Sequence, residues 1–306
     1  MPPRILCIGG AVIDRTFHAA APLVRDTSNP AHVTTGFGGV ARNVAEVLAR
    51  LGAEVALASR IGNDAHGELL MQHLNDLHID CSLSARDPHQ PTAEYVAVLE
   101  PDGTLAYGLA AMQIFDGFDD AFVDRIAAAM HGVDWLFCDC NLPAPALQRL
   151  IGEAGARGCK LAVDAVSLAK AKRLPARLDG ISCLFANRDE ARLLTGQEGE
   201  AGLAATLVAR GAGQAVVGRG ADGVSIADGA GEMALTASPV DIVDVTGAGD
   251  SLTGGTLYAL AGGAALAPAA TFGIKLAGMT AGCGESVHPD ISPELAKTHV
   301  SIPVRR

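Results

Sequence analysis

Residues 244–250 carry groups that could do chemistry on a phosphate. They read Asp-Val-Thr-Gly-Ala-Gly-Asp and run into an apolar helical pattern. Small residues let backbone N–H groups converge on an anion, and the start of a helix adds its positive dipole. A carboxylate at Asp250 would face the same anion, where it could remove a proton from an attacking hydroxyl. The segment predicts a kinase with Asp250 as its base, and the anion would be bound by the amides of Gly247, Ala248 and Gly249.

A tight turn with Asp250 as the N-cap of the helix is the alternative interpretation. A second glycine-rich opening favours ligand binding, because residues 36–43 read Gly-Phe-Gly-Gly-Val-Ala-Arg-Asn and also lead into a helix, predicted over 40–51. Asn43 lies on the apolar stripe of that helix. A buried amide needs a partner, which a ligand hydroxyl or a neighbouring backbone carbonyl could provide.

The composition sets limits on fold and partners. The chain has 306 residues, of which 49% are hydrophobic and 19% charged, so it can bury a large core as one domain with a small appendage. Its net charge of −11 gives no general attraction for nucleic acid or an anionic membrane. A phosphate site must therefore be local, and we expect a cation, Mg²⁺, to assist it.

The cysteines and the N-terminus indicate a compartment. Seven cysteines without CxxC spacing are typical of buried thiols in a reducing environment. The first residues lack the layout of a signal peptide, and no stretch is long and apolar enough to span a bilayer. We expect a cytoplasmic protein that binds neither nucleic acid nor a membrane.

Apolar runs of strand length alternate with helical patterns along most of the chain. This alternation predicts an α/β fold with a central, mostly parallel sheet flanked by helices. A dinucleotide-binding fold would need GxGxxG after the first strand, whereas residues 9–10 read as part of a continuing strand. Strands are expected at residues 5–13, 54–59, 135–140, 160–163, 181–185 and 215–217, and helices at 40–51 and 66–77.

One region interrupts the alternation. Residues 93–100 and 104–110 read as strands joined by Pro101-Asp102-Gly103, a strong hairpin turn. With residues 15–35 they could form a lid that excludes water from phosphoryl transfer. An edge hairpin or a dimer contact is the alternative, and both are compatible with a lid. The expected division is a main α/β domain of residues 1–14, 37–90 and 112–306, and a small β lid of residues 15–36 and 91–111.

These residues together resemble the ribokinase-like, PfkB-type carbohydrate kinases over nearly the whole chain. The family's second signature matches residues 244–250, and no P-loop of the GKS/T kind is present. The first signature matches Gly38, Gly39, Asn43, Leu51, Gly52, Gly62, Asp64 and Gly67.

The resemblance implies roles for further residues. Asp14 matches the carboxylate that grips sugar hydroxyls, although it could instead cap a turn. Asn187 and Glu190 match an NxxE element near Mg²⁺ and phosphate, with Glu190 acting through water, although the pair could simply open a helix. Glycines beside the nucleotide correspond to Gly220 and Gly223, and a K⁺ site would be bordered by Asp244 and Thr246.

Within the family, several short strings are similar to those of pseudouridine kinases. Val40 replaces a lysine and Asn141 a sugar-contacting glutamate of ribokinases, which disfavours a free sugar, because its hydroxyls would lack partners. The strings are Ser28-Asn29-Pro30, Gly39-Val40-Ala41-Arg42-Asn43, Asp139-Cys140-Asn141, Val163-Asp164-Ala165-Val166-Ser167 and Asn187-Arg188.

The implied reaction transfers the γ-phosphoryl group of ATP to the 5′-hydroxyl of a ribonucleoside, with pseudouridine as the first candidate. The sugar would be held by Asp14, Asn43, Gly38, Gly39 and Asn141, and a homodimer would form through the lid. Ribokinase or another nucleoside or sugar kinase is the alternative substrate class. A non-catalytic sensor on the same fold is the alternative of another kind, but a sensor has no need of a carboxylate at Asp250.

Overall fold

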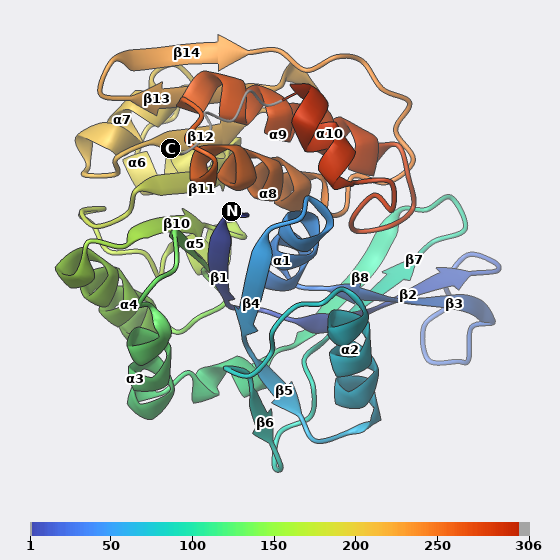
Figure 1. Ribbon diagram of the computed structural model, residues 1–306. Helices are drawn as coiled ribbons and strands as arrows, with labels where there is room; N and C mark the ends of the chain where they lie inside the picture. Colours follow the sequence, from blue (N-terminus) through green and yellow to red (C-terminus); the bar gives the residue numbers. More distant parts are fainter. Residues whose placement is uncertain (1, 300–306) are drawn as a thin grey trace.

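Eight strands form the central sheet of the computed structural model, which describes residues 2–299 (Figure 1). Their spatial order is β14-β13-β12-β11-β10-β9-β1-β4. All neighbouring strands from β12 to β4 in this order pair in parallel, whereas the β12–β13 and β13–β14 pairs are antiparallel. The sheet confirms the predicted fold class. Its strands are β1 (Arg4–Ile8), β4 (Glu54–Ala58), β9 (Trp135–Asp139), β10 (Lys160–Asp164), β11 (Cys183–Asn187), β12 (Ala215–Gly218), β13 (Val224–Asp228) and β14 (Gly231–Leu235).

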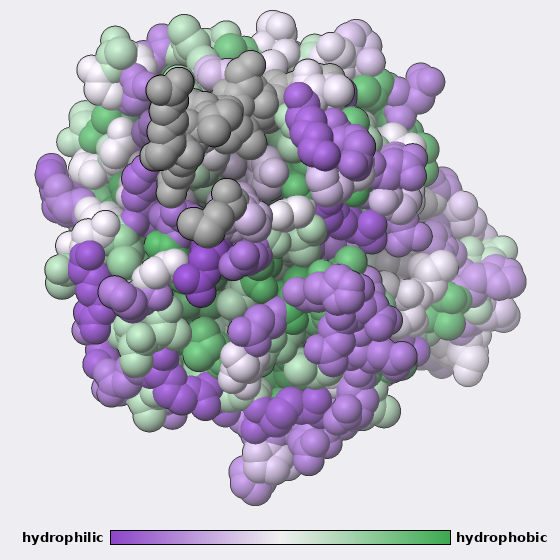
Figure 2. Space-filling model, viewed as in Figure 1, coloured by the Kyte–Doolittle hydropathy of each residue, from purple (hydrophilic) through white to green (hydrophobic). Residues whose placement is uncertain are grey.

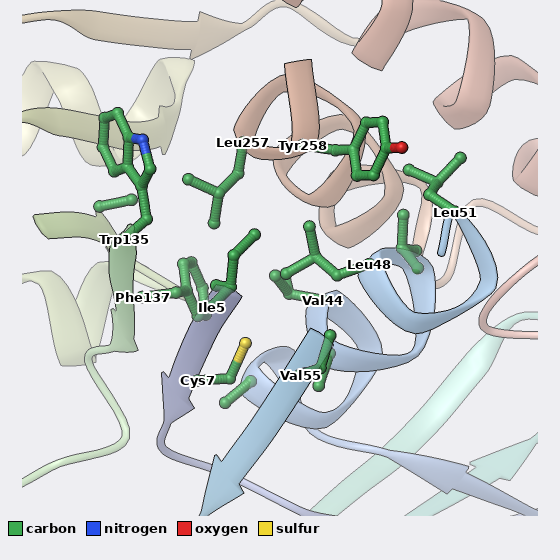
Figure 3. Packing of buried hydrophobic residues seen from close by; sticks show 14 of the residues in the cluster. Ile5, Cys7, Val44, Leu48, Leu51, Val55, Trp135, Phe137, Leu257 and Tyr258 are labelled. Atoms are coloured by element: carbon green, nitrogen blue, oxygen red, sulfur yellow. The ribbon is translucent and has the colours of Figure 1, made fainter. Parts of the chain in front are cut away.

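Helices cover both faces of this sheet because successive side chains of a strand point to opposite faces. Ile5 and Cys7 of β1 pack against α1 and α8, as Figure 3 shows, whereas Leu6 and Ile8 pack on the side of α3 and α4. The first face carries α1 (Val40–Arg50), α2 (Ala65–Asp76), α8 (Ala248–Ala261), α9 (Leu266–Ala281) and α10 (Pro293–His299), and the second α3 (Asp120–Ala129), α4 (Ala144–Arg157), α6 (Arg188–Thr195) and α7 (Leu203–Ala209).

The predicted helices at 40–51 and 66–77 are confirmed as α1 and α2. The prediction of one strand over residues 5–13 was wrong. β1 ends at Ile8, and β2 begins at Val12 in another sheet. The amide of Gly10 donates to Oδ2 of Asp139 instead of to a neighbouring strand, and this contact turns the chain out of the central sheet.

A second sheet of four strands projects from the main body, with spatial order β3-β2-β7-β8 (Figure 1). The predicted hairpin turn is present: Glu100 donates from its amide to the carbonyl of Thr104, and Asp102 accepts from the Thr104 amide. The sheet starts and ends slightly outside the expected boundaries at residues 15 and 36. Its strands are β2 (Val12–Ala19), β3 (Ala31–Gly38), β7 (Glu94–Leu99) and β8 (Leu105–Ala111), and a separate pair consists of β5 (Arg60–Gly62) and β6 (Ala85–Asp87).

Figure 2 shows one face of the molecule, on which hydrophilic and apolar residues are mixed. Apolar residues also lie among polar ones over the small sheet at the right. Exposed apolar side chains of this sheet include Val33, Leu105 and Leu109. In the part of the chain that the structure describes, no helix is long and apolar enough to cross a membrane. All seven cysteines are unpaired thiols, and five of them are buried.

Candidate active site

Polar residues end three adjacent parallel strands and a glycine ends the next one, all at the same edge of the central sheet. Asp139 ends β9, Asp164 ends β10, Asn187 ends β11, and Gly218 ends β12. Ligands of open α/β sheets bind at the carboxyl ends of the strands. A cavity of about 160 Å³ lies at this edge, where α8 begins, and its lining includes Asp164, Asn187, Glu190, Gly218, Gly249 and Asp250.

Asp250 lies in the first turn of α8, whose N-cap is Gly247 and not Asp250. Gly247 has φ +75°, and a Cβ there would lie 1.8 Å from the carbonyl oxygen of Ser286, so this turn requires glycine. Burial raises the pKa of Asp250 to about 6, although a hydrogen bond from Asn43 lowers it. A carboxyl group with this pKa is ionised at neutral pH and basic enough to accept a proton.

The two glycine-rich openings predicted from the sequence meet in the structure. Nδ2 of Asn43 on α1 donates to Oδ2 of Asp250 over 2.5 Å. The partner of the buried Asn43 amide is therefore the carboxylate of Asp250, which was not among the two partners expected from the sequence. The bond fixes the orientation of the carboxylate relative to α1.

Arg42 supports this contact, and the sequence reasoning missed it. Its guanidinium is almost fully buried and donates from Nε to Oδ1 of Asn43 over 3.0 Å, so the Asn43 amide must point Nδ2 at Asp250. It also donates to Oε2 of Glu46 over 2.6 Å and to the carbonyl of Phe37 over 2.8 Å. The available signal was the Arg42–Glu46 spacing of four residues on a predicted helix.

Asp14 lies on β2, directly after the chain has left the central sheet. Burial raises its pKa to about 6, while the positive charge of Arg42 lowers it. A Cβ on Gly38 would lie 1.9 Å from Oδ2 of Asp14, so only glycine leaves room for this carboxylate. Gly39 is the N-cap of α1. Arg42 is a shared neighbour whose charge acts on both Asp14 and Asp250.

Asp139 is a second residue that the sequence reasoning passed over. Its Oδ2 accepts hydrogen bonds from the amides of Gly10 and Ala41, both over 2.9 Å, and its Oδ1 accepts from the amide of Asn141. The Ala41 amide at the start of α1 is therefore satisfied by a protein carboxylate. This contact ties the start of α1 to β9. The cavity is lined by Gly249 and Asp250 of the other opening, together with Val40 of α1.

Asn141 is buried next to this carboxylate. Its Oδ1 accepts a hydrogen bond from the ammonium of Lys170, and a side-chain hydrogen bond joins it to Asp139. Asn141 was predicted to contact substrate directly, yet its amide is held on both sides by protein groups.

Asn187 and Glu190 form a capping box at the start of α6, which was the alternative interpretation of the NxxE element. Oε1 and Oε2 of Glu190 accept from the side chain and the backbone amide of Asn187 over 2.7 and 2.8 Å. Both residues also line the cavity. Burial raises the pKa of Glu190, and burial together with the charges of Asp250 and Glu190 raises that of Asp164.

These carboxylates are suited to holding Mg²⁺ through its bound waters and the substrate phosphates, and not as a set of direct ligands. Crowded carboxylates that raise each other's pKa favour a cation among them. However, the oxygens of Glu190 are engaged with Asn187, and residues 2–299 contain no cluster of three or more His, Cys, Asp or Glu side chains arranged to hold a metal. Mg²⁺ commonly keeps several waters and substrate phosphates as ligands, which is compatible with this site.

The remaining predicted residues, at the nucleotide and K⁺ positions, are not among those that line the cavity. A 3-10 turn, η2 (Gly220–Asp222), begins at Gly220, two residues after Gly218 of the cavity lining, and Gly223 directly follows it. Asp244 and Thr246 are exposed in the segment before α8, where Oδ1 of Asp244 accepts from the amide of Thr246 over 2.8 Å.

Comparison with known proteins gives one consistent result. The pseudouridine kinase of Escherichia coli (strain K12) is 28% identical, covering 94% of this chain and 93% of the relative. A carbohydrate kinase structure from Agrobacterium tumefaciens is 32% identical with a TM-score of 0.84, covering 98% and 97%. An Arabidopsis thaliana ribokinase complexed with ribose and ATP has the same fold at 20% identity, with a TM-score of 0.82 and coverage of 97% and 99%. The family described as pfkB family carbohydrate kinase matches residues 2–292, which confirms the resemblance. The chain therefore belongs to the PfkB family of carbohydrate kinases.

Proposed function

We propose that this protein transfers the γ-phosphoryl group of ATP to the 5′-hydroxyl of a ribonucleoside, with pseudouridine as the preferred substrate. The observation that carries the proposal is the Asn43–Asp250 hydrogen bond, which places a carboxylate of suitable pKa beside the small residues that open α8. A sensor would have no use for a half-buried carboxylate whose pKa is raised by its surroundings. The family membership supports phosphoryl transfer to an alcohol.

In this proposal, side chains and backbone amides of the site each have a role in the reaction. Asp250 accepts the proton of the attacking hydroxyl as the phosphoryl group arrives. Amides of Gly247, Ala248 and Gly249 stabilise the charge on the transferring oxygens, and one such donor contributes roughly 2.7–4 kcal/mol in comparable oxyanion sites. Asp14 holds the ribose hydroxyls, because a misaligned nucleophile loses most of the advantage of proximity.

ATP would lie along the glycine turn at Gly220 and Gly223 and reach the start of α8. Mg²⁺ would neutralise charge on the phosphates, with Glu190 and Asn187 holding its waters. A K⁺ ion beside Asp244 and Thr246 is part of the proposal, and it would help to order the segment before Gly247. Replacing K⁺ by Na⁺ in the assay tests this part by itself.

The preference for pseudouridine rests on two features. The first is the similarity to a pseudouridine kinase over nearly the whole chain. The second is the pair of departures from ribokinases at Val40 and Asn141, which remove charged partners for the hydroxyls of a free sugar. The competing substrates are ribose, another nucleoside, and another sugar of the kind that kinases of this family phosphorylate.

The test is ATP turnover by the purified protein with Mg²⁺ against pseudouridine, uridine, adenosine, cytidine and ribose. We expect the highest kcat/KM for pseudouridine, and Asp250→Asn should abolish turnover while leaving nucleoside binding measurable. A higher kcat/KM for ribose or adenosine would overturn the preference for pseudouridine, whereas the assignment as a kinase would still stand. Binding without turnover of any substrate would favour the sensor.

We also propose a cytoplasmic homodimer that pairs through the small sheet. The exposed apolar side chains Val33, Leu105 and Leu109 support this, since they lie on strands that project from the main body (Figure 1). Light scattering coupled to gel filtration tests it: Leu109→Glu should convert a dimer to a monomer, and a monomeric wild type would contradict the pairing.

A further inference from the structure

Lys170 lies next to Asn141 of the predicted sugar site, and its hydrogen-bond partners are uncharged. It belongs to the short helix α5 (Leu168–Ala171) and is half-buried. Its ammonium donates to Oδ1 of Asn141 and lies 3.5 Å from the sulfur of Met112, which is a weak acceptor. An ammonium can donate three hydrogen bonds, so Lys170 retains donor capacity that these two contacts do not use.

Asn141 holds this lysine in place. Its backbone amide donates to Oδ1 of Asp139 over 2.9 Å, and its side chain also bonds to Asp139. The carbonyl of Asn141 accepts from Nη1 of Arg173 over 2.8 Å, and the carbonyls of the residues on both sides of it accept from the same atom. The turn after β9 is therefore rigid, and the amide oxygen of Asn141 is directed at Lys170 and not at a ligand.

Lys170 and the proposed base Asp250 both feel the charge of Asp139. The carboxylate of Asp139 is a common neighbour: its charge raises the pKa of Lys170 against the larger effect of burial, and it also acts on Asp250. Met112 directly follows β8, the returning strand of the small sheet. Lys170 thus lies where the end of the small sheet, the turn after β9 and α5 meet.

The backbone is strained at Val166, directly before the N-cap of α5. Val166 has φ +67°, a conformation that is an outlier for a β-branched residue. The amide of Ser167 donates to the carbonyl of Ala165 over 2.8 Å, and that of Val166 donates to Oδ1 of Asp164. This arrangement is a strained γ-turn, and such strain concentrates at functional sites. Val166 and Asp164 both line the cavity, so the turn connects the cavity to the helix that carries Lys170.

We propose that Lys170 determines base specificity by donating a hydrogen bond to a ring carbonyl oxygen of the nucleoside. This inference rests on the nucleoside kinase function proposed above and adds the chemistry that selects the base. An ammonium donates only, so it pairs with a carbonyl oxygen of a uracil-type ring, whereas adenine offers no ring carbonyl. A desolvated donor left without its acceptor weakens binding of the wrong base.

Steady-state kinetics of Lys170→Met test the proposal, with Lys172→Met as the matched control because Lys172 is exposed at the end of the same helix. At saturating ATP, Lys170→Met should raise the KM for pseudouridine and uridine roughly tenfold or more, the usual scale for losing a charged hydrogen bond. Its kcat should stay within about threefold, as expected for a binding contact. Ribose, which has no base, should show an unchanged kcat/KM.

Two further outcomes separate this inference from the function on which it rests. Equal losses with pseudouridine and ribose, or no change with either, would overturn the role of Lys170 while nucleoside turnover by the wild type still stands. If the wild type phosphorylates ribose and no nucleoside, the proposed function and this inference both fail. Lys170→Arg, which keeps a cationic donor, should recover part of the pseudouridine KM, and equal melting temperatures of all variants would show that folding is intact.

Discussion

Asn43 and Asp250 are 207 positions apart in the chain, yet Nδ2 of the first lies 2.5 Å from Oδ2 of the second. The contact joins the first turns of α1 and α8, which pack together on the same face of the sheet. Because the amide oxygen of Asn43 is occupied by Arg42, the nitrogen has one direction left, toward the carboxylate. The catalytic base proposed here is thus oriented by a chain of groups that starts in the hydrophobic core.

Asn43→Ala removes the hydrogen bond that stabilises the ionised form of Asp250. We expect the acidic limb of the kcat/KM profile to move to higher pH, because this bond lowers the pKa of Asp250. At pH 8 the loss in kcat/KM should be roughly tenfold to a hundredfold, the range for a hydrogen bond to a charged group. Asn75→Ala, an exposed asparagine of α2, is the control. An unshifted acidic limb would contradict the orienting role.

The pH dependence of the wild type follows from two carboxyl groups. The pKa of Asp14 and that of Asp250 are each raised to about 6, so both groups are protonated well below pH 6. A base must be ionised to accept a proton, and therefore kcat/KM should fall as the pH drops below about 6. The slope should be about tenfold per pH unit if one ionised group is needed and steeper if both are. Asp14→Asn should reduce the slope to that of one group, and a rate that is flat from pH 7 to pH 5 would refute the assignment.

Asp250→Asn should stabilise the fold at neutral pH. The folded-state pKa of Asp250 is about 6 against an ordinary value of 3.8, so the folded protein binds this proton more tightly than the unfolded chain does. The free energy of unfolding therefore falls as the pH rises from about 4 to 6, by roughly 1–3 kcal/mol for this group. The neutral asparagine avoids that cost. Thermal denaturation at pH 7.5 and pH 4.5 checks the prediction, with Asp76→Asn at the exposed end of α2 as control.

The buried residues of the core could be predicted from the sequence, because the spacing of apolar residues indicates which face of a strand or helix is buried. Val44, Val47 and Leu48 of α1 are fully buried, as the stripe predicted. The end of β1 at Ile8 was not readable, because an apolar run continues across the point where the chain changes sheets. Hydrogen bonds between distant residues mark that point, among them the bond from the Gly10 amide to Asp139, 129 positions away.

The identities of the main site residues could be predicted from the sequence, but the contacts that orient them could not. Glycines and carboxylates with special spacing pointed to residues 14, 43 and 250, whereas the groups that orient them were missed. A lone arginine on a helix usually lies at the surface, so the burial of Arg42 depends on Glu46 and Phe37 in the folded chain. Asp139 looked like a residue of an ordinary strand end, and its three amide partners come from three separate places in the sequence.

Arg42→Met tests the buried charge network directly. The Glu46 carboxylate, whose pKa is about 2 in the fold, would lose its most buried cationic partner, although His73 and Arg50 remain in contact with it. Breaking a buried ion pair costs about 3–5 kcal/mol, whereas Arg149→Met, at a surface ion pair, should cost below about 1 kcal/mol. Urea denaturation gives both values. Arg42→Met/Glu46→Met should recover part of the loss, and equal effects at the two arginines would argue against the network.

Gly247→Ala and Gly249→Ala separate folding from phosphate binding at the start of α8. Gly247 has φ +75° and no space for a side chain, so alanine there should lower the melting temperature and abolish activity together. A Cβ on Gly249 meets no atom within 4 Å, and alanine favours a helix, so Gly249→Ala should keep or raise the melting temperature. Its activity should nevertheless fall if phosphate oxygens approach this backbone closely. Gly152→Ala, in an equally open position of α4, controls for the gain in helix propensity. Full activity in Gly249→Ala would mean that the transferring phosphate does not approach the second residue of α8, and the proposed anion site would then reduce to the amides before it.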